Sequence, residues 1–177
     1  MEHRNTSNAH EFELSADRNS ANTDLHSKII IEDILANDSN ISDHNLENLT
    51  NVLSQLTTVN ITDIKLLRNY LTSLNCHEQN KKYILVVKYN EQIIGTGSIL
   101  LENKIIHNLG KVGHIEDIVI DKNFRGFGIA TKLVEKLIEI GKNENCYKII
   151  LEASNNVRKF YEKLGFSEYS NSMKIVF

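Results

Sequence analysis

The sequence predicts a mixed α/β domain in which strands and helices share one core. Short runs rich in β-branched residues, such as Tyr83–Val87, alternate with segments whose leucines and isoleucines recur at helical spacing. A chain of 177 residues offers room for one domain, or for one domain and a tail. Its hydrophobic content of 41% and charged content of 24% are those of an ordinary globular domain.

The polar N-terminal part is expected to be a tail. Residues 1–27 carry few apolar side chains, and these form no periodic face, so we expect this segment to be disordered. The domain itself is expected over residues 28–177. It begins with a short β-branched strand at Ile29–Ile31.

Two helices are expected after this strand. In the first, Asp43 is the expected N-cap, and leucines recur along one face over 43–56. In the second, Thr62 is the expected N-cap, and Ile64–Leu74 supplies an apolar face.

A hairpin and a second group of helices and strands complete the domain. Tyr83–Tyr89 and Ile93–Leu101 are predicted to be strands joined by a turn at Asn90-Glu91. A further strand over 113–121 leads through a glycine-bearing turn into a helix. The last expected elements are a strand at Tyr147–Glu152, a short helix from Val157 to Leu164 ended by Gly165, and strands at Ser167–Ser170 and Met173–Phe177.

Charge, hydropathy and cysteine usage exclude several classes of protein. The formal net charge of −3 argues against a nucleic-acid-binding domain, which would usually be basic. The apolar runs are far shorter than the ~20 residues of a membrane helix, and the N-terminus has no secretory signal. Cys76 and Cys146 lie far apart and outside any zinc-binding pattern, so we expect free thiols, no metal and a cytoplasmic location.

The segment with the clearest chemistry is Gly113–Ala130, where a buried strand runs into the turn Arg125-Gly126-Phe127-Gly128 and then into a helix. Glycines allow a ligand to approach the backbone closely, and the first N–H groups of a helix have no internal partners. Together they suit a pyrophosphate, with Arg125 adding charge. The alternative is a plain connection whose glycines only set the turn. The spacing is too short for a dinucleotide fingerprint or a P-loop.

Arg125-Gly126-x-Gly128-Ile129-Ala130 resembles the acetyl-CoA pyrophosphate loop of the GNAT acetyltransferase superfamily. Beyond the loop, residues 102–120, 145–152 and 155–166 resemble the eukaryotic glucosamine 6-phosphate N-acetyltransferases. The resemblance implies the GNAT acyltransferase fold, a mixed and mostly antiparallel sheet flanked by helices. It also implies a homodimer that transfers acetyl from acetyl-CoA to the amine of D-glucosamine 6-phosphate, without an acyl-enzyme, for UDP-N-acetylglucosamine synthesis.

The resemblance assigns four residues to the reaction. Tyr161 is expected to protonate the thiolate of CoA, although its spacing also fits the apolar stripe of its helix. Glu116 and Asp117 are expected to contact the sugar, or else form an acidic pair at a solvated strand edge. As neighbours in a regular strand they would face opposite sides, unless a bulge intervenes. Glu152 is expected to orient the amine or to relay its proton.

The resemblance also implies two sets of binding residues. Those expected at the cofactor are Ile118, Val119, Ile120, Arg125, Gly126, Phe127, Gly128, Ile129, Ala130, Thr131, Asn156, Tyr161 and Lys163. Those expected at the sugar and its phosphate are Thr57, Lys104, His107, Glu116, Asp117, Tyr147, Lys148 and Arg158. Asn156 could equally be a helix cap, and Lys163, Lys104 and Arg158 could be ordinary surface charges. Relatives carry an arginine near the C-terminus that contacts the phosphate, and Val176 stands there in this chain.

Two other functions fit parts of the sequence. The first is a GNAT enzyme for another amine, such as a polyamine or a protein N-terminus. A polyamine site would require clustered acids and no phosphate-binding cations. The second is a non-catalytic acyl-CoA-binding module, which would keep the loop without needing Tyr161.

Overall fold

The computed structural model describes residues 24–36, 41–61, 63–74, 81–169 and 173–176. Helices and strands follow one another in the order β1 (Ile29–Asp33), α2 (Asp43–Leu53), α3 (Ile64–Leu74), β2 (Lys82–Tyr89), β3 (Gln92–Asn103), α4 (Ile106–Leu109), β4 (Lys111–Ile120), a 3₁₀ turn (Lys122–Phe124), α5 (Ile129–Asn143), β5 (Cys146–Leu151) and α6 (Arg158–Lys163). Most expected elements are therefore present, with bounds that differ by a few residues.

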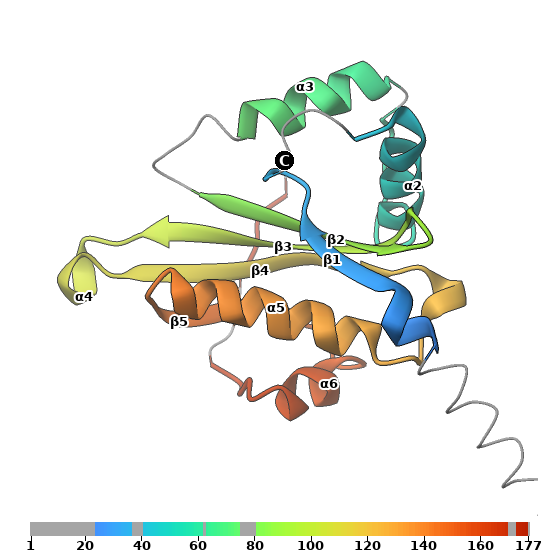
Figure 1. The fold of residues 1–177 in the computed structure, drawn as a ribbon. Coiled ribbons are helices and arrows are strands. Elements are labelled where there is room, and N and C mark those ends of the chain that lie inside the picture. The colour runs from blue at the N-terminus through green and yellow to red at the C-terminus, as the bar shows by residue number, and fades with distance from the viewer. Residues whose placement is uncertain (1–23, 37–40, 62, 75–80, 170–172, 177) are drawn as a thin grey trace, which may run out of the picture.

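The strands form one sheet in the order β1-β2-β3-β4-β5. Neighbours are antiparallel except β4 and β5, which are parallel, so the expected mixed and mostly antiparallel sheet is confirmed (Figure 1). Asn90 and Glu91 join β2 to β3 with φ values of 48° and 64°. This is the left-handed pair that a two-residue hairpin turn requires.

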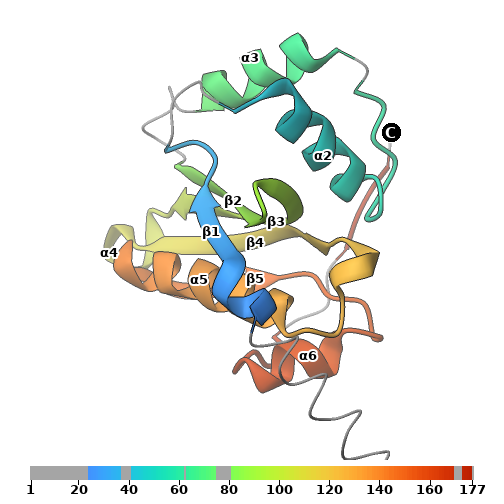
Figure 2. The same cartoon turned by 45° about the vertical axis from the view of Figure 1, so that its right-hand side comes forward.

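Helices cover both faces of the sheet, with α2 and α3 on one side and α5 and α6 on the other (Figures 1 and 2). Leu133 and Leu137 of α5 are fully buried in a core that includes Ile99 and Ile115 of the sheet. A second core lies under α2 and α3 and contains the fully buried Leu46. Burial of each such side chain is worth roughly 1.5–3 kcal/mol, and the apolar helical stripes therefore fix both layers.

A bulge interrupts β4 in its second half. Thr96 and Ser98 of β3 pair with Val119 and Glu116, so β4 has one more residue than β3 across the same interval. Asp117 takes up the extra length with a φ of 56°. Because bulges redirect side chains and bend strands, this one changes what β4 presents at its C-terminal end.

The two expected helix caps differ from the structure. The side chain of Ser42, not of Asp43, accepts a hydrogen bond from the N–H of Asn45 and caps α2. Thr62 lies outside the described residues. The neighbouring Asp63 caps α3, since its carboxylate accepts from the N–H of Lys65 at 2.8 Å. In both cases the correct cap is one residue from the expected one, and both residue types serve as N-caps.

The expected C-terminal strands are wrong for the residues that the structure describes. Residues 167–169 and 173–176 are not in strands. Met173, Ile175 and Val176 are 97%, 77% and 79% exposed. Their apolar pattern indicated burial, but the pattern does not specify a strand to pair with, and these residues pair with none of the strands that the structure describes.

The folded part extends slightly beyond the expected N-terminal boundary. Residues 24–28 form a helical turn before β1. Leu25 is 9% exposed and joins the core that α5 closes. Residues 1–23 lie outside the described part, so their expected disorder stays a prediction. Of the described helices, none combines the length and hydropathy that crossing a membrane requires.

Candidate active site

The C-terminal half of β4 has a free edge. Pairing between β4 and β5 runs only as far as Ile115 and Leu151. Residues 116–120 pair with β3 on their other edge. The two parallel strands therefore separate, and no described strand pairs with this edge of residues 116–119, whose alternate N–H and C=O groups suit an extended ligand. This is where Ile118, Val119 and Ile120 were expected to border the pantetheine arm.

The turn after β4 forms a backbone anion site. Gly126 and Gly128 have φ values of 85° and 73°, conformations that side chains rarely adopt. Gly128 is the N-cap of α5 and supplies no side-chain hydrogen bond. Ile129, 1% exposed, anchors the first turn in the core. The first N–H groups of α5, which include those of Ala130 and Thr131, thus lack helical partners and lie at the positive end of the helix dipole.

Arg125 braces this turn. Its Nε donates to the carbonyl oxygen of Ile120 at 2.8 Å, and its Nη2 lies 3.4 Å from Oε1 of Gln55. Gln55 also accepts from the N–H of Lys122 and donates to Asp121, each at 2.9 Å. The guanidinium that was expected at the phosphates is therefore engaged at the base of the turn, and Gln55 ties the end of α2 to the same point. In the sequence, Gln55 belongs to the segment 55–58, which resembles the end of the first helix of the glucosamine 6-phosphate N-acetyltransferases, but no pattern indicated its contacts with Arg125 and Lys122.

The four residues expected in the reaction line a single cavity of about 950 Å³. β4 supplies Glu116 and Asp117, the segment after β5 supplies Glu152, and α6 supplies Tyr161. The first and the last of these residues in the chain, Glu116 and Tyr161, are 45 positions apart (161 minus 116). The cavity opens where β4 and β5 diverge, so the free edge of β4 borders it.

The bulge brings both acids of β4 to the cavity. In a regular strand Glu116 and Asp117 would lie on opposite faces of the sheet. In the structure both are exposed and both line the cavity, because the left-handed backbone at Asp117 alters the alternation. The sequence left this alternative open, and the structure decides it in favour of a bulge.

Tyr161 is half-buried between aromatic rings. Its ring centroid lies 4.9 Å from that of Phe160 and 5.9 Å from that of Phe166, both in edge-to-face geometry. Burial raises the pKa of its hydroxyl, so the group is protonated at neutral pH. Its two expected roles coincide, since the ring belongs to the core and the residue also lines the cavity.

The lining of the cavity is strongly acidic. Its carboxylates are Glu116, Asp117, Glu152, Glu162 and Glu168, and its basic side chains are Arg158 and His114. Arg158 is itself paired, with Nε 2.8 Å from Glu162 and Nη2 2.9 Å from Glu168. These partners raise the pKa of Arg158. The cavity therefore favours a cationic group such as an ammonium more than it favours a phosphate.

The other expected phosphate ligands lie outside this cavity lining, and their charges are engaged. Lys104 Nζ lies 2.5 Å from Glu102, and Lys148 Nζ donates to the hydroxyl of Tyr169 at 2.9 Å. Lys104 lowers the pKa of Glu102, and Lys148 lowers the pKa of the Tyr169 hydroxyl. A phosphate would have to displace these partners to bind the two lysines.

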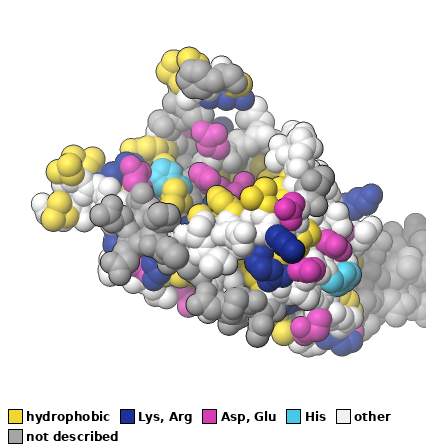
Figure 3. All heavy atoms as spheres, turned by 90° about the horizontal axis from the view of Figure 1, so that it is seen from above, with side chains coloured by type: hydrophobic (Ala, Val, Ile, Leu, Met, Phe, Trp, Pro, Cys, Tyr) yellow, Lys and Arg dark blue, Asp and Glu magenta, His cyan; other side chains and the backbone are white. Residues whose placement is uncertain are grey.

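His107 lies at a strained hairpin tip. His107, Asn108 and Leu109 have φ values of 55°, 56° and 60°, a left-handed conformation that is costly for residues with side chains. The His107 ring stacks on Tyr147 with centroids 4.3 Å apart. Strain of this kind persists where the surrounding structure enforces it, often at functional positions. Apolar side chains gather on this projecting tip (Figure 3).

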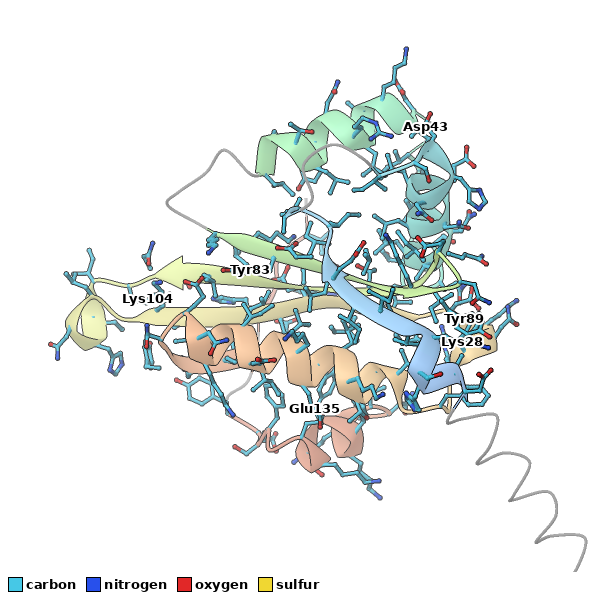
Figure 4. All side chains as sticks on the ribbon, in the orientation of Figure 1. Lys28, Asp43, Tyr83, Tyr89, Lys104 and Glu135 are labelled. Carbon is cyan, nitrogen blue, oxygen red and sulfur yellow. The ribbon has the colours of Figure 1, made fainter. Side chains whose placement is uncertain are left out.

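The expected acceptor residues lie at two ends of the sheet. Thr57 follows α2, close to Gln55 and so to the C-terminal end of β4. Lys104 and His107 lie at the N-terminal end of β4, where Figure 4 shows Lys104 beside α4. The ten residues of β4 span roughly 30 Å. Thr57 and His107 of one chain therefore cannot reach the same phosphate group.

Of the remaining expected cofactor residues, Phe127 packs partly buried against the core, whereas Asn156 and Lys163 are exposed. Asn156 lies in the turn before α6 and Lys163 on α6, and neither lines the cavity. The structure adds His114, which lines the cavity and whose Nε2 lies 2.9 Å from Glu102. The sequence signal for His114 was its position two residues before Glu116 on the same strand.

Comparison with known proteins shows which proteins this chain is similar to. Residues 48–166 match the model of the Acetyltransferase (GNAT) family. The glucosamine 6-phosphate N-acetyltransferase of Arabidopsis thaliana is 37% identical over 127 residues, which are 71% of this chain and 85% of the relative. That of Trypanosoma brucei brucei is 33% identical over 123 residues, covering 70% of this chain and 77% of the relative.

Solved structures have the same fold. The crystal structure of the Arabidopsis thaliana enzyme has a TM-score of 0.75 and 30% identity, over 84% of this chain and 98% of the other. A predicted acetyltransferase from Clostridium acetobutylicum, solved with acetyl-CoA, has a TM-score of 0.62 and 22% identity, over 84% and 96%. The second likeness concerns the fold alone.

Proposed function

The chain belongs to the GNAT acetyltransferase family, and we propose that it transfers the acetyl group of acetyl-CoA to the amine of D-glucosamine 6-phosphate. The observation that carries this proposal is the convergence of Tyr161, Glu116, Asp117 and Glu152 on one cavity beside the free edge of β4. Two relatives that carry this activity in their names share more than 30% of the aligned residues with the chain.

The reaction that we propose is a direct transfer. The acidic wall attracts the sugar ammonium, and a carboxylate of Glu116, Asp117 or Glu152 accepts its proton. The amine then attacks the thioester carbon, while the N–H of Ile118 stabilises the oxyanion. As the C–N bond forms and the C–S bond breaks, Tyr161 gives its proton to the departing sulfur, and the second proton of the nitrogen leaves through water and restores the tyrosine hydroxyl. The raised pKa of Tyr161 keeps that proton available.

The cofactor follows from the family, whose members use acetyl-CoA. The free edge of β4 suits the pantetheine arm, and the turn at Gly126 and Gly128 with the start of α5 suits the pyrophosphate. Asn156, Lys163 and Thr131 are proposed as outer contacts. In the part of the chain that the structure describes, no group of three His, Cys, Asp or Glu side chains gathers at metal-binding distance.

We also propose that the enzyme is a homodimer. Lys104 and His107 do not line the cavity of their own chain, whereas a second copy could bring its hairpin tip to that cavity. Ile105, Ile106 and Leu109 at the tip are 91%, 63% and 75% exposed, which is typical of an interface. The proposed cellular setting is the cytoplasm, where the product would feed UDP-N-acetylglucosamine synthesis.

The acidic cavity favours a second candidate, acetylation of another cationic amine such as a polyamine. Product identification separates the two: the purified full chain is incubated with acetyl-CoA and, in parallel, glucosamine 6-phosphate, spermidine or a peptide with a free N-terminus. Mass spectrometry is expected to find an N-acetylated product from the amino sugar alone. Product from spermidine or the peptide alone would contradict the proposed acceptor. If no acceptor reacts although CoA binds, the protein is a non-catalytic module.

A further inference from the structure

The helical turn at residues 24–28 lies beside the start of α5. Figures 1 and 2 both show this segment next to the N-terminal end of that helix. Leu25, 9% exposed, packs into the core that also contains Ile129. The turn is fixed locally, because Lys28 Nζ lies 2.7 Å from Asp24 and the Ser27 hydroxyl donates to the Asp24 carbonyl at 2.8 Å. Figure 4 shows Lys28 close to Tyr89 at this end of the sheet.

This anchoring aims His26 at the glycine turn. A Cβ atom placed on Gly128 would lie 3.9 Å from Nε2 of His26, and apart from the adjacent residues no other described atom would lie within 4 Å of it. The imidazole therefore stands next to the residue whose left-handed backbone opens α5. Residue 26 precedes the region that matches the GNAT family model, residues 48–166.

The ring has an unused hydrogen-bonding capacity. Nδ1 of His26 is buried and has no hydrogen-bond partner among the described residues. Because Nδ1 is shielded, a ligand can contact the ring at Nε2, the atom that faces Gly128. An N–H donor beside the start of a helix adds to a place where the helix dipole and the free backbone N–H groups already favour an anion. The position therefore suits a residue that meets an anion.

The neighbouring cation does not fill this role. The Arg125 guanidinium is turned to the carbonyl oxygen of Ile120 and to Gln55. Asp24, the acid on the same turn as His26, is paired with Lys28. From these contacts we infer that His26 is a cofactor-binding residue that donates from Nε2 to the pyrophosphate of CoA. This inference rests on the proposed use of acetyl-CoA and adds a contact from outside the region that matches the family model.

Two thioesters isolate the pyrophosphate contact. S-Acetylpantetheine carries the reacting group and the pantetheine arm of acetyl-CoA but has no pyrophosphate. His26→Gln is expected to lower kcat/KM for acetyl-CoA about tenfold and to leave kcat/KM for S-acetylpantetheine unchanged. His26→Arg, which supplies N–H donors at this position, should recover part of the loss. His44→Gln, on the exposed face of α2, is the matched control and should change neither value.

The outcomes separate this inference from the proposed function. Equal losses for both thioesters, or no loss for either, would overturn the contact, and the melting temperature shows whether a loss comes from unfolding. Calorimetry with CoA alone measures the effect of His26→Gln on CoA affinity and does not depend on turnover. If the wild-type protein binds CoA but acetylates no amino sugar, the proposed acceptor is contradicted. In that case His26→Gln must still weaken the binding of CoA about tenfold. A wild-type protein that binds no CoA overturns both.

Discussion

The two halves of the candidate site are built from different parts of the chain. The cofactor half consists mainly of backbone: the free edge of β4, the left-handed glycines and the start of α5. The acceptor half consists of charged side chains, and its expected cations are already paired with Glu102, Tyr169, Glu162 and Glu168. Backbone donors are available as soon as the fold forms, whereas a lysine or arginine is available only if nothing else holds it. Substitutions in the first half should therefore have the larger effects.

Gly128→Val gives the largest expected loss. A β-branched side chain at a φ of 73° costs about 1–3 kcal/mol of strain and blocks the approach of the pyrophosphate to the turn. We expect CoA affinity to fall at least about a hundredfold by calorimetry. Gly165→Val is the matched control, since Gly165 has a φ of 90° outside the turn. CoA affinity unchanged in Gly128→Val would refute the turn as the pyrophosphate site.

Tyr161→Phe should reduce chemistry without reducing cofactor binding. Removal of a general acid typically costs ~10²–10⁴-fold in rate, and we expect kcat to fall by about a hundredfold. The ring stays in place between Phe160 and Phe166, so CoA affinity should hold within about twofold. Stopped-flow detection of thiol release measures kcat. Tyr70→Phe is the control, because the side chain of Tyr70 on α3 is exposed. An undiminished kcat would remove Tyr161 from the mechanism.

Substitution of single cations in the acceptor half should change activity less than the two substitutions above. Lys104→Met and Arg158→Met are each expected to raise KM for glucosamine 6-phosphate about fivefold, because each charge is already shared with an acid. Neither should change kcat/KM for glucosamine, which has no phosphate. Lys136→Met, which breaks an exposed pair with Glu139 on α5, is the control. Equal effects on both sugars would show that these cations do not recognise the phosphate.

A cluster at the other end of the sheet from the cofactor half should affect stability and leave CoA affinity unchanged. Glu144 accepts a hydrogen bond from Tyr83 and pairs with Lys81 and Lys111 at 2.8 and 3.1 Å, which lowers its pKa from 4.5 to about 2. A depressed folded-state pKa stabilises the protein above about pH 4.5, and this contribution is lost as the pH falls toward 2. Glu144→Gln should therefore lower the free energy of unfolding by about 2 kcal/mol at pH 7, and by much less near pH 2.

Urea denaturation at the two pH values checks this prediction. Glu162→Gln, in an exposed pair with Arg158, should cost below about 0.5 kcal/mol at pH 7. CoA affinity of Glu144→Gln should equal that of the wild type. A loss of CoA affinity would show that the far end of the sheet is coupled to the site.

The two halves also differ in how far the sequence could predict them. Periodicity predicted the helices, β-branched runs predicted the five strands of the sheet, and the glycines before Ile129 predicted the turn that we propose for the pyrophosphate. These signals are local in the chain. Whether Lys104 or Arg158 is free depends on its partners. The Arg158–Glu162 pair follows from i, i+4 spacing on α6, whereas no local pattern specifies the pairs Lys104–Glu102 and Arg158–Glu168.

Two further features depended on contacts that the sequence does not specify. The bulge at Asp117 follows from the register of β3 against β4, so the sequence could only leave it open. The apolar C-terminal run indicated a strand, but a strand needs a neighbour with free hydrogen-bonding groups. Ile175 and Val176 find none among the described residues of their own chain.

The measurement that tests this account most directly is the ratio of kcat/KM for glucosamine 6-phosphate to kcat/KM for glucosamine, with spermidine as a third acceptor. The proposed function requires that the phosphate displaces the acidic partners of the cations. The account predicts a ratio of at least about a hundred, equivalent to roughly 2.7 kcal/mol of discrimination, and no turnover of spermidine. A ratio near one, or faster turnover of spermidine, would contradict it.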